Sequence, residues 1–255
     1  MVRGVVQLSD LHCPHIDKEA LRAITKFVAQ WKPERVVLIG DALNLSGISR
    51  HVQNDLIEQV EERVDTELVS LTSVLDDVVR AAPKVHFDWI WGNHDERLRA
   101  FVQKNPSWKG IIDEPLRLLK EFGGCKHTKR IDIHQFADYD EDFSIGRMAF
   151  VHGHYLGKHP AASHVEAYGQ SVTFGHTHTM QMFSTVRKGL PVAGYTIGHL
   201  MSKRGKRYMK GRPDRWVTGF AYMEYDDRTG IYSQHLIPIV ESQFCFAGKL
   251  YSGLS

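Results

Sequence analysis

Residues 171–180, SVTFGHTHTM, place His176 and His178 directly behind a short apolar run that ends at Gly175. The apolar run predicts a buried strand, and the glycine predicts a turn at its end. Alternate side chains of an extended segment point the same way, so the two imidazoles are expected to face one cavity.

Four further apolar runs end, on their carboxyl sides, in side chains that bind metals. These are Asp10 and His12 in SDLH, Asp41 in IGD, Asn93 and His94 in GNHD, and His152 in VHGH. Open α/β sheets place ligand sites at the carboxyl ends of strands, so these groups are expected to converge although they span most of the chain. Each motif alone is a weak signal, because a D-x-H pair or a Gly-Asp turn also arises by chance.

The remaining periodicities predict an α/β protein with mixed sheets. KEALRAITKFVAQW (18–31) has helical spacing, and RVVLIGD, VHFDWIWGNHD and RMAFVHGH are short apolar strands. Residues 55–82 carry apolar side chains in steps of three and four and end before Pro83, so they predict one long amphipathic helix with a capping-box start at Asp55 and Glu58. Closely spaced strands follow in YTIGHL, GFAYMEY and IYSQHLIPI. Helices on the faces of mixed sheets fit this order.

Length and composition indicate one domain over residues 1–255. Hydrophobic residues make up 42% of the chain, which supports one sizeable core, and the formal charge of +2 favours neither a nucleic-acid coat nor a membrane surface. We expect no membrane association, because the chain has no 18-residue apolar run and MVRGVVQLSD lacks signal-peptide features. Three scattered cysteines without a C-x-x-C pair fit a reducing, cytoplasmic location.

The series D-x-H, G-D-x-x-N, G-N-H-D, H-G-H and G-H-T-H, between Leu8 and His178, resembles the motifs of the calcineurin-like metallophosphoesterase superfamily. The resemblance implies a four-layer α/β/β/α sandwich of two mixed sheets around a dinuclear metal site. It assigns Asp10, His12, Asp41 and His178 to one ion, and Asp41, Asn93, His152 and His176 to the other, so that Asp41 bridges them. It also implies that His94 protonates the leaving oxygen while Asp95 supports the charged imidazole. As an alternative, His94 is a further ligand of the second ion.

The donor types support two divalent cations independently of the resemblance. Imidazole, carboxylate and amide donors without cysteine favour Mn, with Fe, Zn, Ni or Co as alternatives, over an all-oxygen Mg or Ca site. Two carboxylates balance only half of four positive charges, so the site is expected to receive an anion. A phosphate ester there would be attacked in line by a metal-bridging hydroxide. Asn93 and His154 are also expected to contact substrate, with a surface role as the alternative for His154.

Residues 202–216, SKRGKRYMKGRPDRW, concentrate positive charge in one loop. Seven Lys and Arg residues against one Asp give this segment a net charge of +6, so the rest of the chain carries −4 of the total of +2. Tyr208 and Trp216 are interleaved for stacking, and this combination is typical of contacts with a nucleic-acid backbone, although solvated basic loops share it. The candidate substrate-binding residues of this loop are Lys203, Arg204, Lys206 and Arg207.

The second motif bears on the substrate. The protein-phosphatase branch of the family continues it as G-D-x-x-D-R-G, with an arginine that grips a monoester phosphate, whereas this chain has Asn44 and Leu45 in GDALNLSG. We therefore expect a phosphodiesterase, acting on a nucleotide or as a nuclease, with a phosphomonoesterase as the alternative. A non-catalytic binding scaffold is less favoured, because every ligand and His94 are retained. The apolar stripe of residues 55–82 either covers a sheet or forms a homodimer.

Overall fold

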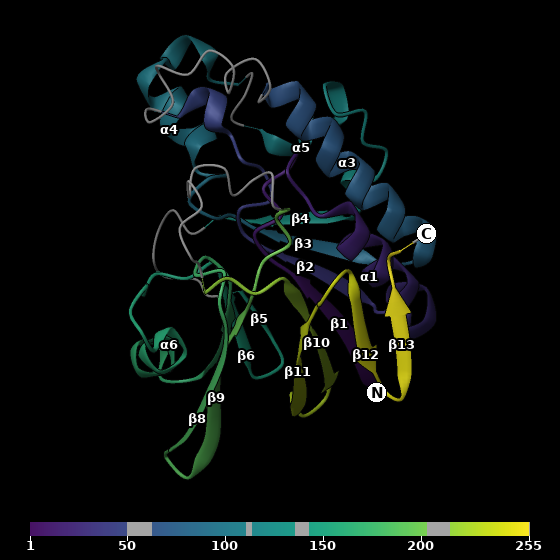
Figure 1. Cartoon of the computed structure of the whole chain (residues 1–255). Helices are drawn as coiled ribbons and strands as arrows, with labels where there is room; N and C mark the ends of the chain where they lie inside the picture. The colour runs from purple at the N-terminus through teal and green to yellow at the C-terminus, as the bar shows by residue number, and fades with distance from the viewer. Residues whose placement is uncertain (50–62, 111–113, 136–142, 203–214, 255) are drawn as a thin grey trace.

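The computed structural model describes residues 1–49, 63–110, 114–135, 143–202 and 215–254. Within them, the larger sheet has the strand order β11-β10-β1-β2-β3-β4 (Figure 1). β1 to β4 run parallel, β10 runs antiparallel to β1, and β11 runs antiparallel to β10. The bounds of these strands are β1 Val2–Leu8, β2 Arg35–Ile39, β3 His86–Ile90, β4 Ile131–His134, β10 Gly219–Asp226 and β11 Tyr232–Pro238.

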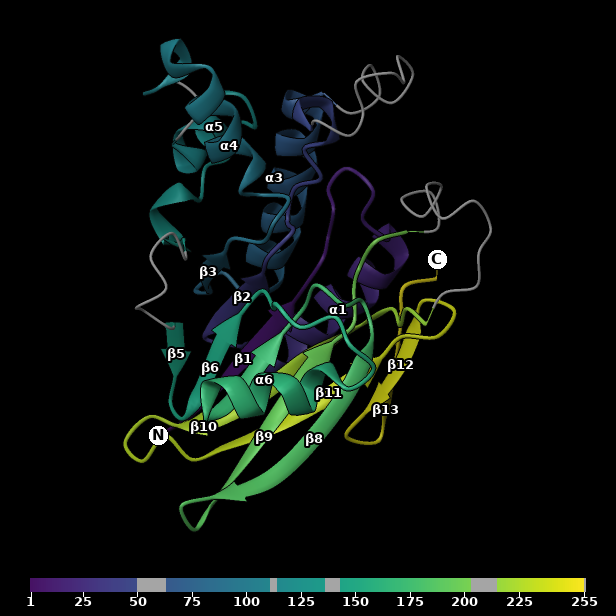
Figure 2. The same cartoon turned by 90° about the vertical axis from the view of Figure 1, so that its left-hand side faces the viewer.

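The second sheet has the order β5-β6-β7-β9-β8 and faces the first (Figure 2). β6, β7 and β9 are parallel, and β5 and β8 pair antiparallel at the edges, so both sheets are mixed as predicted. The bounds are β5 Phe143–Ile145, β6 Met148–Val151, β7 Ser171–Phe174, β8 Met180–Arg187 and β9 Leu190–Ile197. A hairpin of β12 (Gln243–Phe246) and β13 (Lys249–Ser252) lies beside α1.

Helices cover the outer faces of the two sheets. α1 and α3 lie on the first sheet and α6 lies on the second (Figure 2). The helices are α1 Lys18–Trp31, α3 Val64–Ala81, α4 Arg97–Lys104, α5 Pro115–Glu121 and α6 Pro160–Tyr168. Short 3₁₀ turns are η1 Ser46–Ile48, η2 Pro106–Trp108 and η3 Thr128–Arg130.

Alternating side chains of the strands specify the layers. Val6 and Leu8 of β1 pack into the core under α1 and α3, whereas Val5 packs with Phe150 into a second core between the sheets. A third, smaller core joins Phe174 of β7 and its neighbours to α6. Three apolar layers between four layers of secondary structure confirm the predicted α/β/β/α sandwich.

The prediction of one continuous helix over residues 55–82 is wrong at Arg63. α3 begins at Val64, because Arg63 has extended backbone angles of −74° and 138°. The apolar stripe continues through this position, so the periodicity could not show the break. Residues 55–62 lie outside the described part, and Leu71 and Leu75 of α3 are buried in the core. In its described part the stripe therefore covers the sheet, and the homodimer stays a prediction.

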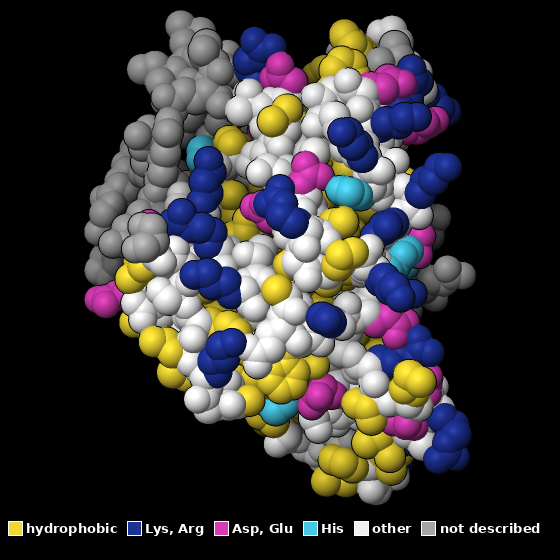
Figure 3. All heavy atoms as spheres, turned by 90° about the vertical axis from the view of Figure 1, so that its right-hand side faces the viewer, with side chains coloured by type: hydrophobic (Ala, Val, Ile, Leu, Met, Phe, Trp, Pro, Cys, Tyr) yellow, Lys and Arg dark blue, Asp and Glu magenta, His cyan; other side chains and the backbone are white. Residues whose placement is uncertain are grey.

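One face of the molecule shows no concentration of one charge. On the side that lies to the right in Figure 1, Lys and Arg side chains are spread over the height of the molecule among Asp and Glu (Figure 3). Cys13 and Cys125 are buried, Cys245 is exposed, and all three are free. None of the helices in the described ranges combines the length and the apolar composition that crossing a membrane requires.

Candidate metal centre

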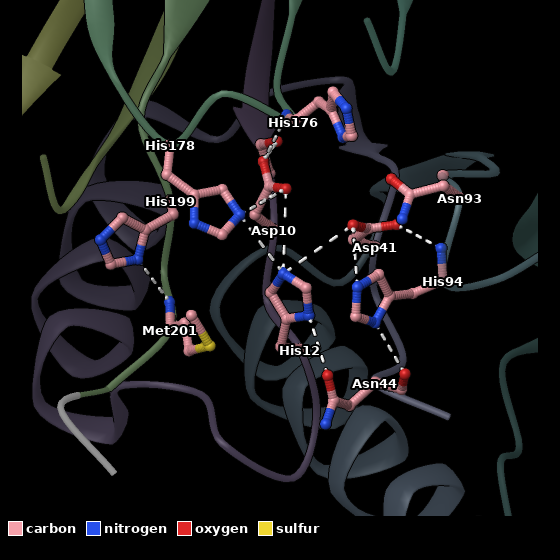
Figure 4. A network of polar contacts seen from close by, with 12 residues as sticks. Asp10, His12, Asp41, Asn44, Asn93, His94, His176, His178, His199 and Met201 are labelled. Carbon is pink, nitrogen blue, oxygen red and sulfur yellow. Dashed lines mark hydrogen bonds and ion pairs between the residues drawn. The ribbon is translucent and has the colours of Figure 1, made fainter. Parts of the chain in front are cut away.

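The carboxyl ends of β1, β2, β3, β6 and β7 bring the predicted metal ligands together (Figure 4). Ligand atoms lie within 4.8 Å of one another in three overlapping groups of described residues: Asp10, His12 and His178; His12, Asp41 and His94; and Asp41, His152 and His176. Asn93 joins the third group through its Oδ1 atom, 3.1 Å from His152 Nε2. The structure thus gathers all seven side chains that the sequence selected.

Five of these residues have left-handed backbone angles. Their φ values are 51° for Asp10, 45° for His12, 50° for Asp41, 64° for His176 and 55° for His178. Residues other than glycine rarely occupy this region, and the strain of doing so concentrates at functional sites. Each turn directs a side chain from its strand end into the shared cluster.

Two glycines of the motifs allow the strand ends to approach. A Cβ atom at Gly92 would overlap the carboxylate and the backbone nitrogen of Asp41. A Cβ atom at Gly175 would overlap Ser9 and the carboxylate of Asp10. The glycines that precede Asn93 and His176 therefore make room for the carboxylates of neighbouring strands.

Three histidines of the cluster are oriented through their Nδ1 atoms. Asn44 Oδ1 lies 3.1 Å from His12 Nδ1, the Asn44 carbonyl lies 2.7 Å from His94 Nδ1, and the Ile39 carbonyl lies 3.1 Å from His152 Nδ1. A carbonyl oxygen can only accept, so each Nδ1 carries the proton and donates it. Each Nε2 atom is then left to act in the cluster, as in metal-binding histidines.

One oxygen of Asp41 lies between these Nε2 atoms. Asp41 Oδ2 is 3.3 Å from His152 Nε2, 3.8 Å from His12 Nε2 and 4.0 Å from His94 Nε2. Its second oxygen accepts the backbone N–H of His94 at 2.8 Å. The Asp41 carboxylate thus contacts both halves of the cluster, in the position that a bridging ligand requires.

The two halves have matching compositions. In the first, His178 Nε2 lies 3.0 Å from Asp10 Oδ1 and 3.4 Å from His12 Nε2. In the second, His152 Nε2 lies 3.1 Å from His176 Nδ1. In each half, nitrogens of two imidazoles converge beside a buried carboxylate, and a divalent cation satisfies all these donors at once. The donor set therefore fits a metal site in both halves.

The charges of the cluster suit a cation. Burial opposes ionisation of Asp10 and Asp41, but His178 lowers the pKa of Asp10 and His152 lowers the pKa of Asp41 below its usual range. Burial disfavours the charged form of His152 as well, yet Asp41 and Asp10 outweigh this and raise its pKa to about 10. Burial lowers the pKa of His12 to about 3. Two buried carboxylates thus draw positive charge toward the second half.

Asp95 is fully buried, and the support of His94 that the motif implies stays a prediction. Its buried carboxylate accepts backbone N–H groups from Gly92 at 2.9 Å, Leu43 at 3.1 Å and Ala42 at 3.4 Å, so it ties two strand-end loops together. Burial raises the pKa of Asp95 to about 7. Burial lowers the pKa of His94, and the neighbouring Asp41 carboxylate opposes this shift.

Arg97 is a residue of this site that the motifs did not reveal. It begins α4 three positions after His94, and its guanidinium lies 3.1 Å from His94 Nε2 and 2.8 Å from the Asn44 carbonyl. The helical i, i+3 spacing from His94 was the signal available in the sequence. Asn44 was noted for the substrate, but its role in holding His12, His94 and Arg97 emerges only in the structure.

Of the remaining candidates, only His154 lies in the described part of the chain. His154 is exposed, stands outside the three groups and donates its backbone N–H to His164 Nε2 at 3.0 Å. Lys203, Arg204, Lys206 and Arg207 lie outside the described residues. On the far side of that gap, Trp216 stacks edge to face on His178 with ring centroids 4.1 Å apart, and Val217 donates its N–H to the His178 carbonyl at 2.8 Å.

The four-layer sandwich with this cluster at its strand ends is a calcineurin-like metallophosphoesterase fold, and its buried His and Asp side chains can hold metal. No protein-family model matches the chain. The chain is 26% identical to the gene 54 protein of Mycobacterium phage D29 and 25% identical to that of phage L5, over 98% of this chain and 99% of each relative.

Solved structures align with the chain over nearly its whole length at low identity. Vps29 from Cryptosporidium parvum gives a TM-score of 0.49 and 12% identity, covering 98% of both chains. Wild-type Vps29 of Entamoeba histolytica, complexed with zinc, gives 0.41 and 14%, covering 99% of this chain and 97% of that one. The Pseudomonas putida nuclease MPE gives 0.39 and 10%, covering 97% and 86%.

Proposed function

We propose that this protein is a metal-dependent phosphodiesterase that acts on a nucleotide or a nucleic acid. The observation that carries the proposal is Asp41 Oδ2, which lies 3.8 Å from a histidine of one half of the cluster and 3.3 Å from a histidine of the other. A shared carboxylate of this kind is how two neighbouring cations are held for phosphate-ester hydrolysis.

In this proposal the two halves hold one divalent cation each, with manganese as the first choice. Asp10, His12, Asp41 and His178 hold one ion, and Asp41, Asn93, His152 and His176 hold the other. When bound, the cations supply Lewis-acid stabilisation of the phosphate and an activated water. Asn44 and the Ile39 carbonyl keep His12 and His152 in the tautomer that presents Nε2.

His94 is the proposed proton donor to the leaving oxygen. Its side chain is 20% exposed, more than those of His12 and His152 at 5% and 7%, so a substrate can reach it. The Asn44 carbonyl holds Nδ1, which leaves Nε2 to exchange a proton at the cluster. Because ligand atoms of His94, His12 and Asp41 lie within 4.8 Å of one another, His94 can alternatively act as a metal ligand.

Two features support a phosphodiester, and in particular a nucleic acid, as the substrate. Leu45 is fully buried, so the position where phosphatases of this family carry their phosphate-binding arginine faces the core. Ser202 and Trp216 flank the basic segment; Ser202 donates its N–H to the His15 carbonyl, and Trp216 contacts His178. A basic segment whose C-terminal flank contacts the cluster through Trp216 suits a phosphate backbone.

Metal-free protein reconstituted with Mn, Zn or Mg tests the proposal. We expect hydrolysis of bis(p-nitrophenyl) phosphate and of single- or double-stranded oligonucleotides, with much weaker hydrolysis of p-nitrophenyl phosphate. Faster monoester hydrolysis would favour the phosphatase alternative. Tight metal binding without hydrolysis of any ester would favour a binding scaffold.

A variant with four substitutions tests separately whether the substrate is a nucleic acid. The substitutions are Lys203→Ser, Arg204→Ser, Lys206→Ser and Arg207→Ser. We expect weaker oligonucleotide binding with a flatter salt dependence and an unchanged rate on the small diester. Serine at Arg187 and Lys188, in the distant β8–β9 turn (Figure 1), is the matched control. Equal losses on both substrates would contradict a contact with the nucleic-acid backbone.

A further inference from the structure

We propose that Arg97 is a catalytic residue that binds a non-bridging oxygen of the phosphoryl group beside His94. The inference rests on the proposed function of the cluster as a phosphoesterase site. The motif GDALNLSG has Leu45 where the phosphatases carry a phosphate-binding arginine. In this inference, Arg97 at the start of α4 supplies the positive charge instead.

The position of the guanidinium is the first argument. One nitrogen of Arg97 lies 2.8 Å from the Asn44 carbonyl and the other lies 3.1 Å from His94 Nε2. The same Asn44 carbonyl accepts from His94 Nδ1 at 2.7 Å. Arg97 and His94 are therefore anchored on one backbone oxygen and hold a fixed position relative to each other.

The direction of the hydrogen bonds is the second argument. A guanidinium can only donate, so His94 Nε2 accepts from Arg97. That same Nε2 faces Asp41 Oδ2 at 4.0 Å, on the side where the proposed ions lie. The N–H groups of Arg97 thus point toward the border of the metal cluster. An oxygen of a phosphate bound at that border would accept from them.

The chemistry of the two groups explains why they stand together. Phosphate oxygens prefer the planar fork of a guanidinium, and charge on the non-bridging oxygens is stabilised by such donors in the transition state. When a phosphate oxygen accepts from Arg97, the N–H···N contact to His94 is exchanged for an N–H···O contact. His94 Nε2 is then no longer engaged by Arg97 and is free to take up from solvent the proton that it gives to the leaving oxygen.

Arg99 provides a matched control on the same helix. Its Nε atom pairs with Glu96 at 2.8 Å, and its side chain is 40% exposed. Arg99→Ala therefore removes one arginine from α4 without touching His94 or Asn44. Arg97→Ala removes the proposed phosphate contact, and Arg97→Lys keeps the charge without the fork.

The experiment uses the metal-reconstituted protein and measures metal content, the affinity for inorganic phosphate by calorimetry, and kcat/KM on bis(p-nitrophenyl) phosphate. For Arg97→Ala we expect two retained metals, phosphate affinity reduced at least about tenfold, and kcat/KM reduced by about 10²- to 10³-fold, as for loss of one transition-state donor. Arg97→Lys is expected to lie between Arg97→Ala and the wild type, and Arg99→Ala to match the wild type.

Unchanged phosphate affinity in a folded Arg97→Ala protein, or loss of a metal ion from it, would overturn the inference. If Arg97→Ala does not fold, a folded Arg97→Lys with wild-type phosphate affinity and kcat/KM would overturn it as well. A wild-type protein that hydrolyses no phosphate ester would instead reject the proposed function. The two failures are therefore distinguishable.

Discussion

At the scale of single residues, the protonation pattern of three histidines explains why the cluster suits metal. Carbonyl oxygens accept from the Nδ1 atoms of His12, His94 and His152, so the three Nε2 atoms lie toward one carboxylate, that of Asp41. A divalent cation bound among them would be attracted by the carboxylate and coordinated by the Nε2 atoms.

The first prediction concerns Asp41, the shared carboxylate. Asp41→Asn should lose at least one metal ion and abolish hydrolysis, because the amide carries no charge and the two cations then repel each other. Elemental analysis together with the diester assay measures both effects. Asp77→Asn is the control, because Asp77 lies on α3 beside Arg80, outside every group of described side chains that could hold a metal, and the variant should keep metal and activity. Two tightly held metals and near-normal turnover in Asp41→Asn would reject the two-ion site.

The second prediction separates a proton donor from a ligand at His94. His94→Asn should keep both metals but lower turnover by about 10²- to 10⁴-fold on esters with basic alkoxide leaving groups. The loss should shrink for a nitrophenolate ester, since that group departs without a proton. The metal content of the variant and its rates on the alkoxide and nitrophenolate esters distinguish a proton donor from a ligand. If the variant loses a metal, or if both esters slow by the same factor, His94 acts as a ligand or orients one.

At the scale of elements, the turns behind the strands position the cluster. β1, β2 and β7 are each followed by left-handed residues that redirect the chain, and glycine stands where the neighbouring strand end comes close. β7 and β1 meet in this way, because Gly175 faces Ser9 and Asp10. The same contact places the His176 N–H 2.9 Å from Asp10 Oδ2.

The third prediction tests this close approach. Gly175→Ala should destabilise the fold by about 1–3 kcal/mol, the usual cost of overpacking. It should also weaken metal binding by displacing Asp10. Gly157→Ala is the matched control, because nothing lies within 4 Å of a Cβ atom there, and it should stay within about 0.5 kcal/mol of the wild type. Urea unfolding and metal titration measure the two effects, and equal stability of the two variants would contradict the packing argument.

At the scale of the whole molecule, the site joins both sheets. Asp10, Asp41 and His94 follow strands of the larger sheet, whereas His152, His176 and His178 follow strands of the smaller one. Ions held by residues from both sheets bind the folded state and not the unfolded chain. Metal binding and global stability are therefore coupled.

The fourth prediction follows from this coupling. Removal of metal with a chelator should lower the midpoint of thermal unfolding, and added Mn²⁺ should restore it in proportion to the logarithm of its concentration. A single ion at 100 times its dissociation constant contributes about 2.7 kcal/mol. Differential scanning calorimetry measures the shift, and Asp41→Asn should show a smaller one. A midpoint that does not respond to Mn²⁺ in the wild type would exclude metal binding across the two sheets.

The sequence by itself determined the local features of this protein. α1 spans Lys18–Trp31 as the apolar spacing predicted, because Asp17 caps it and its stripe packs on the sheet. The strands with their Gly turns, and the residue types behind them, were also visible, since each depends on a few neighbouring positions. From these features an α/β protein with mixed sheets and the convergence of the strand-end side chains could be predicted, whereas the four-layer sandwich was implied by the resemblance to the family.

Only the tertiary structure decided where the side chains beside the ligands point. Asp95 follows His94 in the chain, yet its carboxylate is taken by backbone N–H groups of two loops. Arg97 reaches His94 because α4 begins there and the Asn44 carbonyl lies opposite. The break of the helix at Arg63 was equally hidden. These outcomes depend on partners distant in the sequence, and local spacing carries no information about which partner competes best for a buried polar group.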